Sequence, residues 1–305
     1  MQYLNSSVEI SEIIAKYAKS EILWLDTEVA DYDTKKPRLS LIQILDDSND
    51  TTGEKVVVFD VLDQPDIVAD FISEIMVNPA IEKVFHNASY DLRYLGNKKA
   101  ENVTCTLKMA KNIPYYILPT PNYKLKTLAT ILCNQSMNKQ EQSSDWGQRP
   151  LTKEQIDYAS KDCIYLAQVH QQLLELDKQA YPNPAKESIR LLVAKYKEIE
   201  QQYKFVNSEY DNLHERVKKA MLAQNIDETL DLKLLNSERK TFKVAFQELV
   251  ELVNVQNLDL DFPVTLTQSL QKDLGDNLDK LTVKIEKIAS LRLTSKNQKD
   301  EKEEE

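Results

Sequence analysis

Cysteine is scarce in this sequence, and its few copies lie far apart. Cys105, Cys133 and Cys163 form neither a C-x-x-C motif nor the spacing of a zinc site. A small secreted domain held by disulfides would carry more cysteines, in an even number. We therefore interpret the three as reduced core thiols, which indicates a reducing compartment.

A positive net charge and long apolar runs are also absent. The 305 residues carry 39 Lys and Arg against 49 Asp and Glu, a formal net charge of -10. This balance argues against a polybasic coat that binds nucleic acid indiscriminately, although it allows a local basic track. No uncharged apolar run approaches the ~20 residues of a membrane span, and the first residues lack the pattern of a signal peptide. We expect a soluble, cytoplasmic protein of one large domain or two ordinary ones.

The first half of the chain alternates strand-like and helix-like segments. Short apolar or β-branched runs predict strands at 21–28, 38–45, 54–61, 82–87 and 102–106. Apolar residues at helical spacing predict helices at 64–80 and 123–133, with another beginning at 88. This order of elements predicts an α/β core.

A capping box marks the start of a further helix in the second half. Thr152 and Gln155 have the spacing in which each side chain caps the other's backbone, and the helix is expected to run to about residue 178. The break "YPNPA" at 181–185 is the predicted domain boundary. Residues 181–294 are expected to form a mostly helical accessory domain, in which the alternating segment 282–293 leaves strand or helix open. The charged tail 295–305 is expected to be disordered.

Acids are concentrated at a few positions that the predicted elements could bring together. Asp26 and Glu28 end the first strand two residues apart, so both point the same way and repel each other unless a cation offsets the cost. Asp91 lies in the predicted helix after "VFHN", and Tyr158 and Asp162 share one face of the capped helix. Hard oxygen ligands of this kind suit Mg²⁺ or Mn²⁺, whereas zinc would favour His or Cys.

Each of these pieces also has an ordinary structural explanation when taken alone. An acidic pair at a sheet edge is more often solvated than bound to metal. Asp91 could simply favour the positive end of a helix dipole, and Tyr158 with Asp162 could be a solvated i,i+4 pair. Their order and surrounding residues together, however, match the pattern of a known family.

The sequence resembles ribonuclease D, of the DEDD exonuclease superfamily, in its tyrosine-bearing subclass. The stretch "WLDTEVADYDTKKPRLSLIQI" resembles the first motif, "KVFHNASYDLRYL" the second, and "YASKDCIYL" the third, with its Y-x-x-x-D frame. The segment "SSDWGQRPLTKEQIDYA" is also similar to the family. The resemblance covers roughly residues 5–178 and implies a ribonuclease H-like fold with a mixed five-stranded sheet flanked by helices.

The activity that the resemblance implies is stepwise, metal-dependent hydrolysis of RNA from its 3′ end, releasing nucleoside 5′-monophosphates. The expected substrates are tRNA precursors or other structured RNA with a single-stranded 3′ terminus. Asp26, Glu28 and Asp162 would hold one Mg²⁺ or Mn²⁺ ion, and Asp26 with Asp91 would hold a second. Two such ions can stabilise both the attacking and the leaving oxygen of an in-line displacement. Tyr158 would position the attacking water through a hydrogen bond.

Four further residues are candidates for holding the RNA. His86 and Asn87 follow a strand end and could contact the terminal nucleotide, although an ordinary hydrogen-bonded His is an equal alternative. Lys139 and Arg149 resemble family positions near the scissile end, where they would hold phosphate. Arg149 could instead pair with Asp145 and fix its loop.

A local surplus of positive charge follows the second motif. Residues 92–126 contain one acid, Glu101, against seven basic residues: Arg93, Lys98, Lys99, Lys108, Lys111, Lys124 and Lys126. Four tyrosines are interleaved with them: Tyr94, Tyr115, Tyr116 and Tyr123. Such a track could follow a phosphate backbone and stack bases. The alternative is a set of ordinary solvated lysines.

Two other functions stay open. A DNA-directed 3′-5′ exonuclease would use the same fold, but the ribonuclease D-like "SDWGQRPLT" segment and the lack of a recognisable polymerase or helicase region disfavour it. A catalytically silent RNA-binding scaffold is also possible, although all four acids and the tyrosine are present. Residues 181–305 do not show the pattern of the helical RNA-docking domains that related tRNA-trimming enzymes carry, and they could instead bind a partner.

Overall fold

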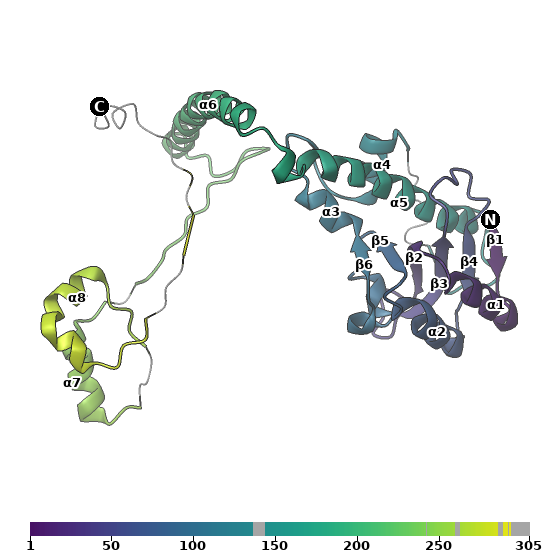
Figure 1. Cartoon of the computed structure of the whole chain (residues 1–305), viewed down its shortest axis with the longest axis horizontal. Coiled ribbons are helices and arrows are strands. Elements are labelled where there is room, and N and C mark those ends of the chain that lie inside the picture. Colours follow the sequence, from purple (N-terminus) through teal and green to yellow (C-terminus); the bar gives the residue numbers. More distant parts are fainter. Residues whose placement is uncertain (137–143, 242, 260–262, 286–288, 292, 294–305) are drawn as a thin grey trace. The chain divides into compact units, whose positions relative to one another are not determined.

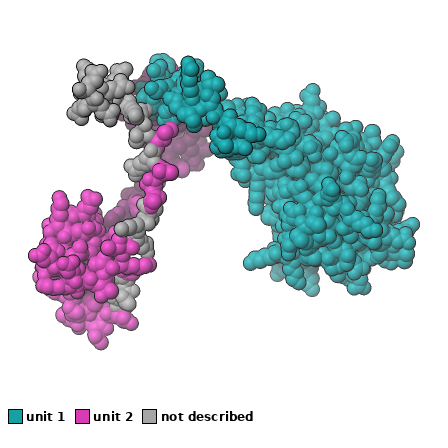
Figure 2. Space-filling model, in the orientation of Figure 1, with its two compact units in different colours: residues 1–208 teal, residues 209–305 magenta. Residues whose placement is uncertain are grey.

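The structure is a computed structural model that describes residues 1–136, 144–241, 243–259, 263–285, 289–291 and 293 (Figure 1). The chain divides into two compact units, residues 1–208 and residues 209–305 (Figure 2). The first unit contains the α/β core. In the part of the chain that the structure describes, no helix is both long and apolar enough to cross a membrane.

A mixed sheet of six strands forms the centre of the first unit. Its order is β1 (Gln2–Leu4), β4 (Val57–Asp60), β3 (Arg38–Leu45), β2 (Ile22–Ala30), β5 (Glu82–Phe85) and β6 (Val103–Cys105). β3 is antiparallel to both of its neighbours, and the other pairs are parallel. The predicted mixed sheet flanked by helices is confirmed, but the expected number of five strands is wrong. β1 has only three residues, which is too short for an apolar alternation to be visible.

The two faces of the sheet are covered by different helices. Figure 1 shows α1 (Ser7–Tyr17) and α2 (Pro65–Phe71) on one side and α5 (Lys153–Ala180) on the other. Leu23 and Leu25 of β2 are buried in the cluster with α1 and α2, whereas Trp24 is buried in the cluster with α5. Alternate residues of β2 therefore face opposite helical layers, as the strand period of two requires.

The predicted helix 64–80 is present, but its second half is wound differently. After α2 the chain continues as a π-helical turn, η1 (Ile72–Met76). Two helices that follow β6, α3 (Thr106–Asn112) and α4 (Leu125–Cys133), pack against α5 through a third buried cluster that includes Ala110, Leu128 and Leu173. These helices form one wall of the cleft described below.

The prediction of a helix that begins at residue 88 is wrong. The segment instead makes two short 3₁₀ turns, η2 (Asp91–Arg93) and η3 (Asn97–Lys99). Asn87, Gly96 and Asn97 have φ angles of 64°, 90° and 51°. These left-handed residues bracket η2 and cannot lie inside a right-handed helix, so the helix does not extend.

The region after the α/β core is mostly helical, as expected. It contains α6 (Ile189–Ala223), α7 (Phe246–Gln256) and α8 (Gln268–Leu274), with 3₁₀ turns η5 (Pro184–Lys186) and η6 (Gly275–Lys280). The break predicted at 181–185 begins where α5 ends. The described residues of the alternating segment 282–293 form neither a helix nor a strand. The charged tail 295–305 lies outside the described residues.

Candidate active site

The period of strand β2 delivers two carboxylates to the face that α5 covers. Asp26 and Glu28 lie two and four residues after Trp24, which packs under α5. Because alternate residues of a strand point to the same face, both acids share the side of the sheet on which Trp24 lies. Glu28 is 8% exposed although it is charged. The register of β2 with β3 shifts directly after the second acid, between Glu28 and Val29, and the pairing then continues in the new register.

Helix α5 supplies the third carboxylate. The predicted capping box is confirmed. The backbone N–H of Gln155 donates to Thr152 Oγ1 at 3.1 Å, and the backbone N–H of Thr152 donates to Gln155 Oε1 at 2.9 Å. One residue beyond Asp162, the buried Cys163 thiol donates to the Trp24 carbonyl oxygen at 3.6 Å. This contact joins α5 to β2 beside the acids. The capped start and the anchored middle of α5 together fix where Asp162 lies.

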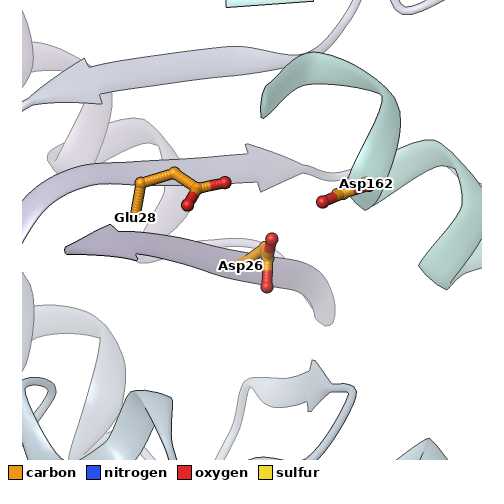
Figure 3. A group of neighbouring side chains, drawn as sticks. All are labelled: Asp26, Glu28 and Asp162. Carbon is orange, nitrogen blue, oxygen red and sulfur yellow. The ribbon is translucent and has the colours of Figure 1, made fainter. Parts of the chain in front are cut away.

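Asp26, Glu28 and Asp162 converge on one small volume. Each offers a carboxylate oxygen, and the three oxygens lie within 4.8 Å of one another. Figure 3 shows the carboxyl groups of the strand and the helix turned toward a common point. Two oxygens bound to one Mg²⁺ at about 2.1 Å lie at most about 4.2 Å apart. The upper limit of 4.8 Å is slightly wider than this, so it is the all-carboxylate donor set, gathered at nearly ligand spacing, that points to a hard divalent cation.

Asp91 lies beside this group but is held differently. Asp91 is 3% exposed, and its carboxyl group accepts a hydrogen bond from Thr27 Oγ1 at 2.7 Å. Burial raises the pKa of Asp91 to about 7, although the hydrogen bond from Thr27 acts in the opposite direction. Asp91 lines the same cleft, but it is not among the three acids that the described structure brings within 4.8 Å.

Tyr158 lies one helical turn before Asp162 and hydrogen-bonds to it. Burial raises the pKa of Tyr158 far above its ordinary value, and the negative charges of Asp162 and Glu28 raise it further. The phenol is therefore neutral at physiological pH and acts as an O–H donor. Its ring packs against Trp146, with centroids 6.1 Å apart.

A cleft of about 970 Å³ opens over these side chains. All five predicted catalytic residues line it: Asp26, Glu28, Asp91, Tyr158 and Asp162. Three members of the predicted basic track, Lys111, Tyr123 and Lys124, lie on its wall. Its volume lies in the range of pockets that hold small ligands.

His86 and Asn87 also line the cleft, at the end of β5. His86 Nδ1 lies 2.9 Å from Thr106 Oγ1, whose hydroxyl donates to the Phe85 carbonyl oxygen at 3.2 Å. Because that hydroxyl has only one hydrogen, Nδ1 is the donor in this contact. Asn87 has a φ of 64°, so the chain turns sharply there. The turn directs the chain from β5 to η2, where Asp91 lies.

Arg149 is occupied elsewhere. Its Nε and Nη2 atoms donate to the two carboxyl oxygens of Asp60, at 2.5 and 2.6 Å, and Nη2 also donates to Ser40 Oγ at 2.9 Å. It does not line the cleft. The alternative pairing with Asp145 is not formed, since the guanidinium lies on Asp60, and Asp145 Oδ1 accepts from the Gly147 backbone amide. Lys139 lies outside the described residues.

The sequence did not single out several residues of the cleft. Tyr32, Tyr90 and Asn122 line it, and Thr27 holds Asp91. Tyr90 precedes Asp91 directly, and its ring lies 4.4 Å from the Arg93 guanidinium carbon. Tyr32 and Tyr90 could have been found from the sequence, because each lies within a few residues of a predicted metal ligand. Asn122 has no such signal.

Comparison with known proteins connects this cleft to nucleases. A family model described as "3'-5' exonuclease" matches residues 1–176. Ribonuclease D of Shewanella sp. (strain ANA-3) is 28% identical over 183 residues, which are 57% of this chain and 42% of that protein. DNA polymerase I of Aquifex aeolicus is 26% identical over 280 residues, which are 92% of this chain and 45% of the polymerase. The chain thus spans less than half the length of either relative.

A solved structure has the same fold as the α/β core. The Aedes aegypti Nibbler EXO domain superposes with a TM-score of 0.51 at 18% sequence identity, covering 61% of this chain and 92% of that domain. At this identity the likeness concerns the arrangement of helices and strands. The sheet and its helices therefore share the fold of that EXO domain.

Proposed function

The chain belongs to the 3′-5′ exonuclease family and is ribonuclease D-like, and we propose that it shortens RNA from the 3′ end by metal-dependent hydrolysis. The observation that carries this proposal is the convergence of Asp26, Glu28 and Asp162 within 4.8 Å at the floor of an open cleft. The substrates are RNA molecules with a single-stranded 3′ terminus, such as tRNA precursors. The products are nucleoside 5′-monophosphates.

Two divalent cations, Mg²⁺ or Mn²⁺, complete the proposed site. Asp26, Glu28 and Asp162 would hold one of them, and Asp26 with Asp91 would hold the other. When bound, such ions would make a water more acidic and would stabilise negative charge on the leaving oxygen. Thr27 keeps one carboxyl oxygen of Asp91 in a fixed place through its 2.7 Å hydrogen bond. A cation beside Asp91 favours its charged form and offsets the effect of burial.

Tyr158 positions the water in this proposal. Its phenol stays protonated, because burial and the neighbouring carboxylates oppose ionisation. It therefore cannot act as a free-standing base. Its single hydrogen lies on Asp162, so its hydroxyl oxygen can accept a hydrogen bond from a water above the acids. Its hydrogen bond with Asp162 and its contact with Trp146 fix the direction of the hydroxyl.

The wall of the cleft provides the RNA contacts. Lys111 and Lys124 offer ammonium groups for phosphates, and Tyr123 offers an aromatic ring on which a base can stack. His86 and Asn87 contact the terminal nucleotide from the end of β5. Arg149 is assigned a positioning role, since its guanidinium holds the loop before α5 to Asp60 and Ser40.

A time course on end-labelled RNA tests the proposal. With Mg²⁺, 5′-labelled RNA should give a ladder of progressively shorter products, and 3′-labelled RNA should release a labelled mononucleotide first. Asp26→Asn should lower the rate about 10³-fold, because metal stabilisation of the transition state is worth several kcal/mol. Asp70→Asn, an exposed acid on α2, is the matched control and should leave the rate unchanged. Internal cleavage, or a ladder from the opposite end, would contradict the assigned polarity.

A DNA-directed exonuclease is the second candidate, and one observation favours it. The alignment with a protein named DNA polymerase I extends over 92% of this chain, beyond the α/β core. Matched RNA and DNA oligonucleotides differ at the 2′-hydroxyl, which a protein can use to distinguish them. Faster degradation of DNA would replace the RNA proposal with this one. Release of no mononucleotide from either substrate with Mg²⁺ or Mn²⁺ would favour a silent RNA-binding scaffold.

A further inference from the structure

Helix α6 carries an apolar stripe that the catalytic proposal does not use. Ten of its apolar residues follow one another at alternating spacings of three and four along the helix: Ile189, Leu192, Tyr196, Ile199, Tyr203, Val206, Tyr210, Leu213, Val217 and Ala220. All ten are exposed in the single chain. A strict 3-4 spacing sustained over more than four heptads is the pattern of a coiled-coil seam rather than of an ordinary helix packed on a globular core.

We propose that α6 pairs with α6 of a second copy of this chain as a parallel, in-register, two-stranded coiled coil. In the heptad, Ile189 and every seventh residue after it occupy the a positions. Leu192 and every seventh residue after it occupy the d positions. The inference is independent of the proposed nuclease activity, since it rests on α6 alone.

The flanking charges fit this arrangement. In a parallel pair, each g residue faces the e residue five positions later on the other helix. Lys195 at g thus faces Glu200 of the second copy, and Glu209 at g faces His214. Glu200 also lies 3.5 Å from Lys204 on its own helix. No e or g residue within this seam meets a like charge. An antiparallel pair that aligns the whole seam would instead place Lys195 near Arg216.

The length of the seam excludes the described helices that follow it in the same chain. From Ile189 to Ala220 the stripe extends about 46 Å at 1.5 Å per residue. α7 has 11 residues and α8 has seven, so they span only about 16 and 10 Å. Neither can cover the stripe, whereas a second α6 matches it along its full length.

Sedimentation equilibrium or light scattering on the full chain tests the pairing. The expected mass is that of two chains at high protein concentration, with dissociation on dilution. Ile199→Glu with Val206→Glu, both at d, should give monomers. The matched control is Leu191→Glu with Phe205→Glu, which replaces two apolar residues at c that are more exposed than the d residues and should leave the dimer intact. Circular dichroism of each variant checks that the helix content of the chain is retained.

Charge reversal provides a second test that does not depend on burying a glutamate. Lys195→Glu alone and Glu200→Lys alone should each weaken the dimer, and the double variant should restore much of its affinity. For orientation, Leu192→Cys and Leu213→Cys should each form a disulfide-linked dimer on oxidation. In an antiparallel pair, a residue meets its own copy only at the midpoint of the overlap. Such a pair could therefore form a disulfide at one of the two positions but not at both.

A monomer at every concentration would overturn the proposal. So would a trimer or larger assembly, a dimer that survives the d-position changes, or charge reversals that have no effect. Cross-linking at only one of the two introduced cysteines would overturn the parallel arrangement.

Discussion

Replacing Arg149 with Met separates two interpretations of this residue. The sequence predicts a phosphate contact for Arg149, whereas the structure places its guanidinium on Asp60. The Asp60 side chain is 9% exposed and that of Arg149 is 26% exposed. Removal of one partner from a buried ion pair destabilises a protein by about 3–5 kcal/mol, because the other charge stays buried. Since Arg149 is partly exposed, we expect a loss of about 3 kcal/mol for Arg149→Met.

Tryptophan fluorescence during urea unfolding is a suitable measurement. The chain has two tryptophans, Trp24 and Trp146, and both are buried in the first unit. The signal therefore reports on the unit that contains the ion pair. Lys55→Met is the matched control: it breaks an ion pair with Asp47 in which the Lys55 side chain is 59% exposed. That change should cost less than about 1 kcal/mol.

The pH dependence of the difference in unfolding free energy between the original chain and Arg149→Met gives a further check. Burial raises the pKa of Asp60, but hydrogen bonds from Arg149 and Tyr3 and the charge of Arg149 outweigh it, so the pKa lies below its ordinary value. A depressed carboxyl pKa stabilises the folded state above the unfolded-state pKa, and this contribution is lost as the pH falls through the folded-state pKa. The difference between the original chain and Arg149→Met should therefore be full at neutral pH and shrink below about pH 4.

The reasoning is refuted if Arg149→Met leaves the urea midpoint unchanged and raises the KM for RNA instead. That result would mean that the guanidinium leaves Asp60 and holds phosphate in the complex. A loss of stability with an unchanged KM at a temperature where the variant is folded supports the positioning role.

Three further predictions concern the cleft. Tyr158→Phe should lower kcat about 10²-fold in steady-state kinetics with little change in KM, and a raised KM at unchanged kcat would contradict a role in positioning water. Asp162→Asn should raise the melting temperature in chelator, because one of three mutually repelling carboxylates becomes neutral, and should abolish the stabilisation by Mg²⁺ that Asp70→Asn retains. Lys111→Ala and Lys124→Ala should each weaken RNA binding and reduce the slope of log affinity against log salt by about one, and unchanged slopes would exclude phosphate contacts.

The parts of the site that sequence could predict depend on local physics. The strand period places Asp26 and Glu28 on one face, and the capping box of Thr152 and Gln155 sets the start of α5 and so the direction of Asp162. These regularities need only a few neighbouring residues. The position of Asp91 followed from family resemblance, and the structure adds the hydrogen bond from Thr27 that no spacing rule indicates.

The parts that sequence missed depend on residues far apart in the chain. Strand β1 exists because Gln2–Leu4 pair with β4, more than 50 residues later. The partner of Arg149 is Asp60, 89 residues away, whereas proximity in sequence suggested Asp145. The helix expected at 88 fails because Asn87 and Gly96 adopt left-handed conformations, which asparagine and glycine permit but do not require.

The acids of the site are held together by the apolar core beneath them. Ala159, Cys163 and Ile164 on α5 are buried against Trp24 and Val58 of the sheet. Burial of such side chains is worth roughly 1.5–3 kcal/mol each for the larger ones. Two like charges about 4 Å apart repel by about 4 kcal/mol at an effective dielectric constant of about 20, so several buried side chains together are needed to offset the repulsion of the acids. Core packing can therefore fix Asp162 beside Asp26 before any ion binds. A cation then stabilises an arrangement that already exists, so its removal should lower stability without dispersing the three acids.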